Sequence, residues 1–200
     1  MNSISNYDGE VLVKTARTIV AEYLKTGKKI TLSDDIRSRF SYNAGVFVTL
    51  NKDEELRGCI GFPTPDRKLH QSLLDAAVAS ATEDPRFLPV TYDELNKISF
   101  EVTVLTPPEV IKVQEPSEYP SRIKVGRDGL IVKWEFGSGL LLPQVPVEYG
   151  WDEEEFLAHT CQKAGAPKDC WKQKGTMILR FEGIVFKETM PEGPIIQVDL

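Results

Sequence analysis

The chain has 200 residues, of which 41% are hydrophobic and 27% are charged, a balance typical of a folded protein with a substantial core. Its net charge of −6 argues against nucleic-acid binding through a broad basic surface, because that mode depends on neutralising many phosphates. No apolar run approaches the roughly 18 residues that span a bilayer, and residues 1–5 lack the basic and apolar regions of a signal peptide, so we expect a cytoplasmic protein without a membrane segment.

Three helical segments are predicted in the first half of the chain. The first runs from Asp8 to about Lys25, with apolar residues at spacings of three and four, Asp8 as its N-cap and Gly27 just past its end. A short turn of helix is expected near residues 33–38, with Ser33 as a candidate N-cap. Residues 68–82 are rich in Leu and Ala and predict a helix whose small residues allow close packing on a sheet.

A β-hairpin is predicted between the second and the third of these helical segments. The apolar run of residues 45–50 precedes a polar turn, and the sequence LRGCIGF of residues 56–62 follows it. Because side chains alternate along a strand, Arg57 and Cys59 are expected on one face. A neighbouring guanidinium favours the thiolate and lowers the pKa of a thiol, and the thiolate is the nucleophilic form.

The same residues have a plainer interpretation. Gly58 and Gly61 suit a place where a ligand or another backbone comes close, so they either give access to Cys59 or relieve packing against a helix. In the second case Cys59 is a small buried hydrophobic residue. Both interpretations stay open at this point.

The second half of the chain predicts further strands and one helix. Residues 83–89 contain two prolines and form an irregular loop that is either a connector or part of a site. Residues 98–105 alternate as a strand whose polar face carries Glu101. A hairpin is expected over residues 123–136 around the Asp128-Gly129 pair, then a helix from Asp152 to Gly165 and a long strand over residues 176–189. Antiparallel hairpins with a few helices indicate an α+β fold.

Cysteine usage and the absence of familiar motifs limit the cofactor chemistry. The chain has three cysteines: Cys59, Cys161 and Cys170. An odd count without paired spacing favours reduced thiols over a disulfide framework. His159 and Cys161 lie near Cys170, but zinc sites usually take ligand pairs from two knuckles and only one such pair exists here. No phosphate loop, dinucleotide glycine fingerprint or hydrolase serine elbow is present. We therefore expect no metal and no cofactor.

Five segments together resemble the AMMECR domain family: LRGCIG at 56–61, DPRF at 84–87, FEVTVLTP at 100–107, GLLLPQVPV at 139–147 and the helix of residues 151–165. The resemblance covers nearly the whole chain as a single domain with largely antiparallel sheets and flanking helices. It implies two lobes with a cleft between them: a larger lobe of residues 1–33 plus 84–200, and a smaller central lobe of residues 34–83 that carries the LRGCIG hairpin.

What the resemblance implies about activity is limited, because the family is widely described as uncharacterised. Its fold is similar, by one proposal, to nucleotide- and nucleic-acid-handling modules, and its members occur fused to or alongside Memo-type and radical-SAM proteins. By analogy, the resemblance implies Memo-type and radical-SAM proteins as partners. It does not imply a particular reaction.

The first functional hypothesis is a cysteine-dependent enzyme acting in the inter-lobe cleft on an anionic or amide-bearing substrate that resembles a nucleotide or a peptide. Cys59 is the nucleophile, Arg57 supports the thiolate or an oxyanion, and Glu101 is preferred over His159 as acid or base. The candidate substrate-binding residues are Gly58, Gly61, Arg86, Gln144 and His159. The plain alternatives are a salt bridge from Arg86 to Asp84 and a hydrogen bond from Gln144 to a loop backbone.

Two other hypotheses assign no chemistry to Cys59. In one, the protein is a binding module whose cleft recognises a nucleotide, a nucleic acid or a protein partner. In the other, the LRGCIG motif serves folding alone. The reactivity of the Cys59 thiol discriminates between the enzyme and these alternatives.

Overall fold

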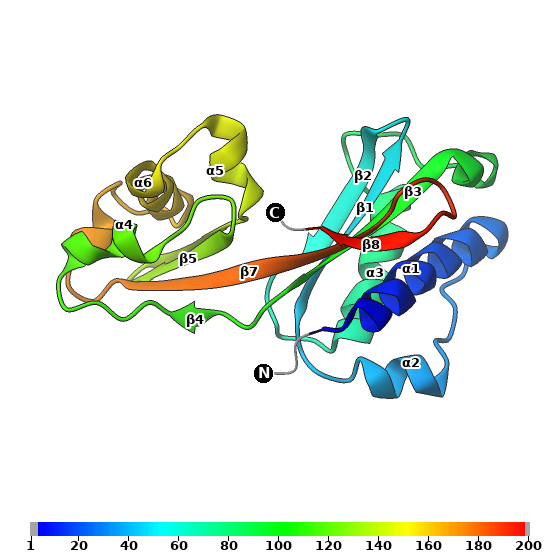
Figure 1. The fold of residues 1–200 in the computed structure, drawn as a ribbon, viewed down its shortest axis with the longest axis horizontal. Helices are drawn as coiled ribbons and strands as arrows, with labels where there is room; N and C mark the ends of the chain where they lie inside the picture. The colour runs from blue at the N-terminus through cyan, green and yellow to red at the C-terminus, as the bar shows by residue number, and fades with distance from the viewer. Residues whose placement is uncertain (1–3, 199–200) are drawn as a thin grey trace. The chain divides into compact units, whose positions relative to one another are not determined.

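The structure, a computed structural model, describes residues 4–198 and divides them into two compact units. The first unit comprises residues 4–105 and 184–198, and the second comprises residues 106–183 (Figure 1). Both are built from antiparallel strands and helices, so the predicted α+β class is confirmed. No helix within the described residues is long and apolar enough to cross a membrane.

The first unit is a curled antiparallel sheet with helices on one face. Its strands β1 (Gly45–Lys52), β2 (Glu55–Phe62) and β3 (Ile98–Leu105) lie in the order β2-β1-β3, with β2 at the free edge. The carboxyl-terminal part of β7 (Met177–Glu188) follows β3, and β8 (Ile195–Val198) pairs with β7. The remaining elements are α1 (Asn6–Thr26), α2 (Asp34–Arg39), α3 (Leu69–Thr82) and the 3-10 helix η1 (Tyr92–Lys97).

Local signals explain the helices of this unit. Ser5, not Asp8, is the N-cap of α1, and Asp8 completes a capping box by binding back to the Ser5 backbone. Gly27 ends α1 in the left-handed conformation, with φ 68°. Ser33 caps α2 as expected, because its side chain accepts the N–H of Ile36.

The core of the first unit lies between the sheet and the helices α1 and α3. Alternate residues of β1 and β3 are buried there, in keeping with the predicted period of two: Val46, Val48, Leu50, Ile98, Phe100, Val102 and Val104. The helix α3 approaches β2 very closely, because a Cβ added at Gly58 would lie 2.1 Å from the carbonyl oxygen of Ser80. The small residues of α3 and the glycine of β2 thus allow the close packing that the sequence predicts.

A buried ion pair joins three parts of this unit. The Arg17 guanidinium of α1 binds the carboxylate of Glu188 in β7, with Nη2 and Oε2 2.5 Å apart, and donates to the carbonyl of Ile98 at 2.6 Å. Glu188 also accepts the N–H of Phe100 at 3.0 Å, and the guanidinium lies over the Phe100 ring. Helix α1, β3 and the end of β7 therefore share one hydrogen-bonded centre.

The second unit packs helices against its own antiparallel strands. Its strands are β4 (Glu109–Val110), β5 (Asp128–Trp134), β6 (Gly137–Leu141) and the amino-terminal part of β7; both β4 and β5 pair with β7, and β6 pairs with β5. Its helices are η2 (Pro116–Glu118), α4 (Tyr119–Arg122), α5 (Gln144–Tyr149), α6 (Glu153–Lys163) and η3 (Cys170–Lys172). Asp128 begins β5 and does not form the hairpin turn predicted for it; the hairpin turn is at residues 135–136, between β5 and β6.

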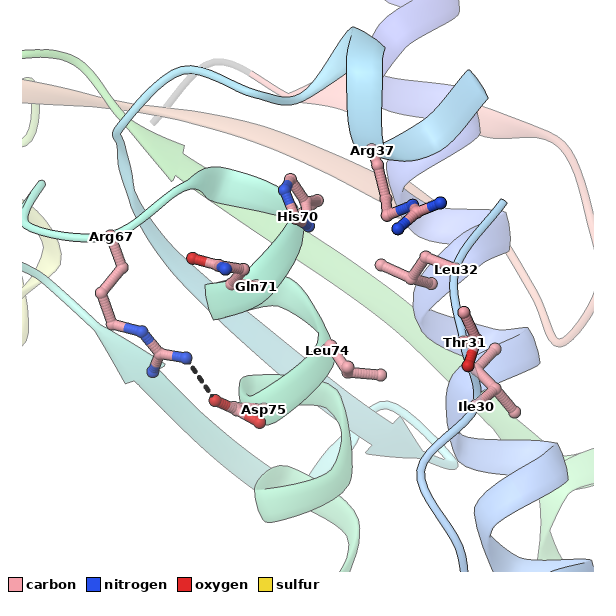
Figure 2. A pocket seen from close by; sticks show the side chains of 9 residues that line it. All are labelled: Ile30, Thr31, Leu32, Arg37, Arg67, His70, Gln71, Leu74 and Asp75. Carbon is pink, nitrogen blue, oxygen red and sulfur yellow. Dashed lines mark hydrogen bonds and ion pairs between the residues drawn. The ribbon is translucent and has the colours of Figure 1, made fainter. Parts of the chain in front are cut away.

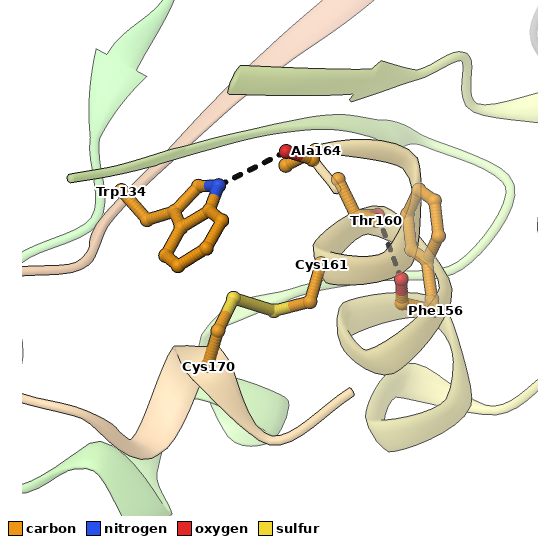
Figure 3. The surroundings of a disulfide bond; sticks show 6 residues. All are labelled: Trp134, Phe156, Thr160, Cys161, Ala164 and Cys170. Carbon is orange, nitrogen blue, oxygen red and sulfur yellow. Dashed lines mark hydrogen bonds between the residues drawn. A yellow bond between two sulfur atoms is a disulfide. The ribbon is translucent and has the colours of Figure 1, made fainter. Parts of the chain in front are cut away.

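A disulfide in the core of the second unit corrects the expectation of three reduced thiols. Cys161 of α6 and Cys170 of η3 are both fully buried and bonded to each other, with their Cα atoms 6.0 Å apart (Figure 3). The chain reverses direction after α6, and this reversal brings Cys170 against Cys161. At the reversal, the carbonyl of Ala164 accepts the indole N–H of Trp134 at 2.9 Å. The odd cysteine count is accounted for by Cys59, which is free.

The bounds of the two units differ from those of the lobes that the resemblance implies. Residues 34–83 do not form a body separate from residues 1–33 and 84–105, because β1 pairs with β3 over its whole length and α1 packs on α3 in one shared core. The second unit is instead a continuous stretch of residues, 106–183, inserted between β3 and the end of β7.

The Arg17–Glu188 centre predicts a large effect of a single substitution. In Arg17→Met, the carboxylate of Glu188 stays buried without its cation, so we expect a loss of about 3–5 kcal/mol in the free energy of unfolding. Lys14→Met is the matched control, since Lys14 lies on the same helix in a solvent-exposed pair with Glu10 and is expected to cost under about 1 kcal/mol. Urea denaturation of both variants measures this, and equal stabilities would refute the role given to Arg17.

Candidate functional site

A row of three polar side chains crosses the sheet of the first unit. Cys59 of β2 pairs with Thr49 of β1, and Thr49 pairs with Glu101 of β3, so the three residues lie side by side in register. Their neighbours along each strand face the core beneath α1 and α3, so this row, which we call the polar row, is on the opposite face. All three are half-buried. The hydroxyl of Thr49 donates to the Cys59 sulfur at 3.3 Å.

A β-bulge separates Arg57 from this row. Leu50 pairs with Gly58, whereas the next residue, Asn51, pairs with Leu56, so Arg57 has no partner across the strands. A bulge redirects the side chain of its extra residue. The expectation that Arg57 and Cys59 share a face assumes an unbroken alternation, and the bulge removes that assumption.

The guanidinium of Arg57 is used in a structural contact. It binds Glu94 of η1, with Nη2 and Oε2 3.2 Å apart, and donates to the carbonyl of Leu88 at 2.8 Å. Lys52 reaches the other oxygen of the same carboxylate at 3.0 Å. These bonds hold the loop after α3 and the start of η1 against the hairpin.

Asp84 connects that loop to the backbone of Cys59. Its carboxylate is almost fully buried, accepts the N–H of Cys59 at 2.8 Å, and binds the Arg86 guanidinium through Nε at 2.9 Å and Nη2 at 2.7 Å. The hydrogen bonds from Arg86 hold the pKa of Asp84 well below its usual range. The salt bridge to Asp84, left open as the plain interpretation of Arg86, is thus present, while 54% of the Arg86 side chain stays exposed.

The surroundings of Cys59 raise the pKa of its thiol. Burial is the largest cause, and the negative charges of Glu101 and Asp84 act in the same direction. The hydrogen bond from Thr49 and the charge of Arg86 oppose the shift without reversing it. The prediction that Arg57 lowers the pKa of the Cys59 thiol is therefore wrong. The cation that acts on this thiol is Arg86, and the neutral form of the thiol is favoured.

The carboxyl of Glu101 is also shifted toward its neutral form. Burial raises its pKa, and the positive charge of Lys187 on β7 opposes the shift. Among the hydrogen bonds of the described residues, none joins Glu101 to Cys59 or to Thr49. The structure thus places Glu101 in the row of Cys59 without the direct contact that a general base needs.

The two glycines of the motif are explained by packing. Gly58 is buried against α3, as described above, and a Cβ added at Gly61 would lie 2.3 Å from the ring of Phe47 on the neighbouring strand. The plain interpretation, relief of packing, therefore accounts for both positions. Ligand contact by either glycine stays a prediction.

Gln144 and His159 belong to the second unit, whereas Cys59, Glu101 and Arg86 belong to the first. Gln144 is the exposed first residue of α5. The imidazole of His159 stacks on the indole of Trp151, with ring centroids 3.8 Å apart and planes 9° from parallel. The substrate-binding roles of these two residues stay predictions.

Two members of the site were missed by sequence reasoning. Thr49 lies within an apolar run that predicts only a strand, and the sequence indicates for Asp84 only a salt bridge to Arg86. The pairing register of the hairpin would have identified Thr49 as the neighbour of Cys59, but a two-residue period alone does not give that register. Within residues 4–198, no cluster of three or more His, Cys, Asp or Glu side chains is arranged to hold a metal ion.

Comparison with known proteins gives consistent matches along the whole chain. A family model described as AMMECR1 matches residues 13–186. A protein of Pyrococcus abyssi is 52% identical over 98% of this chain and 97% of its own length, and one of Methanocaldococcus jannaschii is 50% identical over the full length of both. The crystal structure of the uncharacterized protein PH0010 from Pyrococcus horikoshii superposes with a TM-score of 0.84 at 52% identity, covering 98% of this chain and 99% of that one.

The contacts of Glu94 predict a pH dependence of stability. The backbone N–H of Thr91, together with Lys52 and Arg57, lowers the pKa of Glu94 from 4.5 to about 2. Because the folded-state pKa lies below the unfolded one, this stabilisation is complete above the unfolded pKa and is lost as the pH falls toward 2. Glu94→Gln should therefore be less stable than the wild type at pH 7, by up to about 3 kcal/mol, with the difference shrinking below about pH 5.

Denaturation with urea at a series of pH values measures this difference. Glu22→Gln is the control, since Glu22 forms an exposed pair with Lys25 on α1 and should change stability little at any pH. A wild-type advantage over Glu94→Gln that stays constant down to pH 2 would contradict the account.

Proposed function

This chain belongs to the AMMECR1 family, and from that premise we propose that the polar row of Thr49, Cys59 and Glu101, with Arg86 beside it, binds an amide group of a peptide-like ligand without covalent chemistry. The observation that carries the proposal is the pairing register that sets Thr49, Cys59 and Glu101 side by side on three neighbouring strands. Burial disfavours the charged forms of both Cys59 and Glu101, so the row presents polar groups without a strong nucleophile.

An amide complements these groups. It offers one carbonyl acceptor and one or two N–H donors, and the row offers a hydroxyl, a thiol and a carboxyl that donate and accept in turn. The half-buried setting strengthens such hydrogen bonds compared with those made in water. The carboxylate of Asp84, which accepts the N–H of Cys59, places negative charge near the thiol and disfavours an anion there, so a neutral amide is the better ligand.

The edge of the sheet limits how a peptide can bind. An exposed edge strand usually invites another strand to pair with it. Here the outward N–H of Cys59 is taken by Asp84, and Arg86 Nη2 lies 3.4 Å from the Cys59 carbonyl oxygen. Recognition at this position therefore uses side chains rather than strand addition.

A cysteine-dependent enzyme is the second candidate. The hydrogen bond from Thr49 and the charge of Arg86 both favour the thiolate, which supports this candidate. It also needs a base in contact with the thiol, and the carboxyl of Glu101 makes no hydrogen bond to Cys59 among the described contacts. Arg57, which is bound to Glu94, is not part of this candidate.

Cellular location and partners remain predictions. We infer a cytoplasmic location, and the buried disulfide does not contradict it, because disulfide-rich intracellular proteins occur in hyperthermophiles. The association with Memo-type and radical-SAM proteins and the inter-lobe cleft rest on the family resemblance alone.

Protection of the Cys59 thiol tests the proposed function. All three cysteines lie among the described residues and Cys59 alone has a free thiol, so the neutral reagent methyl methanethiosulfonate labels it selectively under non-reducing conditions. We expect butyramide to slow this reaction severalfold, while its isosteric ketone 2-pentanone and the anion butyrate slow it much less. Glu101→Ala should abolish the protection, and the control Glu10→Ala on α1 should retain it. Equal protection by all three compounds, or none by butyramide, would refute amide recognition.

The pH profile of the same reaction separates the two candidates. The binding proposal predicts an apparent pKa for Cys59 above that of the same thiol in a peptide of residues 56–62. It also predicts a higher value in Arg86→Gln and a lower value in Glu101→Gln, because these variants remove a positive and a negative charge. An apparent pKa below that of the peptide would favour the enzyme instead.

A further inference from the structure

A pocket of about 470 Å³ lies in the first unit, away from the polar row. It is bounded by the first half of α3, by residues 30–32 and by Arg37 of α2 (Figure 2). Its volume falls within the range of small-molecule sites. The leucine side chains of Leu32 and Leu74 give it an apolar wall, while Arg37, Arg67 and His70 supply polar groups.

The charges around this pocket are mostly positive, although the whole chain carries −6. Its one lining carboxylate, that of Asp75, is bound on both sides, by Lys29 Nζ at 2.6 Å and by Arg67 Nη2 at 2.6 Å. Asp75 is therefore neutralised by two cations. This leaves the pocket with an excess of positive charge.

The guanidinium of Arg37 is available to a ligand. Among residues 4–198 its one ion-pair partner is Asp34, one turn earlier in α2, and the Asp34 side chain is 91% exposed. Such a solvent-exposed pair contributes little to stability, so a ligand anion can replace Asp34 as the partner of Arg37 at little cost. In Figure 2 the side chains of Arg37 and His70 lie at the same end of the pocket, and the Arg67–Asp75 pair lies toward the other.

We propose that this pocket binds a small organic phosphate, with the phosphate group between Arg37 and His70 and the organic part against Leu32 and Leu74. Arg37 offers a planar pair of donors that suits a phosphate, and an imidazole adds a further donor when it is protonated. Gln71, on the same turn of α3 as His70, supplies a neutral amide at the rim.

The state of His70 is coupled to such a ligand. Burial and the positive charges of Lys68 and Arg37 lower the pKa of His70; of the other charged groups that line the pocket, Arg67 and Asp75 are paired with each other. A bound phosphate brings negative charge to the imidazole and favours its protonated form. Binding must therefore raise the pKa of His70, by the reciprocity of linked equilibria.

Proton NMR tests the proposal, because the chain has only two histidines. The ring protons of His70 are assigned with His70→Gln, and His159, stacked on Trp151 in the second unit, is the internal reference. The probes are inorganic phosphate and phenyl phosphate, with chloride added to hold the ionic strength constant. We expect both phosphates to raise the apparent pKa of His70 and leave that of His159 unchanged, with phenyl phosphate acting at lower concentration.

Two variants on α2 make the test specific. Arg37→Gln should raise the half-saturating concentration of either phosphate roughly tenfold, which is the effect of losing a charged hydrogen bond. Arg39→Gln is the matched control, because Arg39 is bound to Asp8 and does not line the pocket. The proposal is overturned if phosphate has no more effect on His70 than chloride, if His159 responds equally, or if the two variants behave alike. Equal potency of the two phosphates would overturn the placement of the organic part on the leucines.

Discussion

The arrangement of the candidate site depends on one interaction, the hydrogen bond that the carboxylate of Asp84 accepts from the backbone N–H of Cys59. An edge strand leaves every second N–H without a partner in its sheet, and Asp84 supplies that partner at Cys59. The same buried carboxylate fixes the side chain of Arg86 by accepting hydrogen bonds from two nitrogen atoms of the guanidinium. A single group thus holds the LRGCIG strand, the DPRF loop and the one cation that acts on the thiol.

The two arginines of these motifs have different tasks for a geometric reason. Arg57 occupies the extra position of a bulge and turns to Glu94, so it ties η1 and the loop after α3 to the hairpin. Arg86 lies in that loop and stays more than half exposed while bound to Asp84. The charge next to Cys59 therefore comes from a residue 27 positions later in the chain, and it only partly offsets the burial of the thiol.

Much of the fold is visible in the sequence, because one buried face imposes a regular period. The alternation in β1 and β3 predicts their core faces and places Glu101 on the polar one, and the caps and small residues predict α2 and α3. The bulge at Arg57 is not visible, since only Glu55 and Leu56 of β2 precede it, which is too few residues to show that the alternation changes face there. The Cys161–Cys170 bond and the pocket beside α3 depend on how distant segments pack, which no local pattern records.

The most direct measurement of the role of Asp84 is amide hydrogen exchange at Cys59, followed by NMR in the wild type and in Asp84→Ala. The account predicts that the Cys59 amide is protected in the wild type although it faces the free edge of the sheet. In the variant this amide should exchange far faster, while amides in the middle of β1 and β3 keep their protection. Equal exchange of the Cys59 amide in the two proteins would contradict the account.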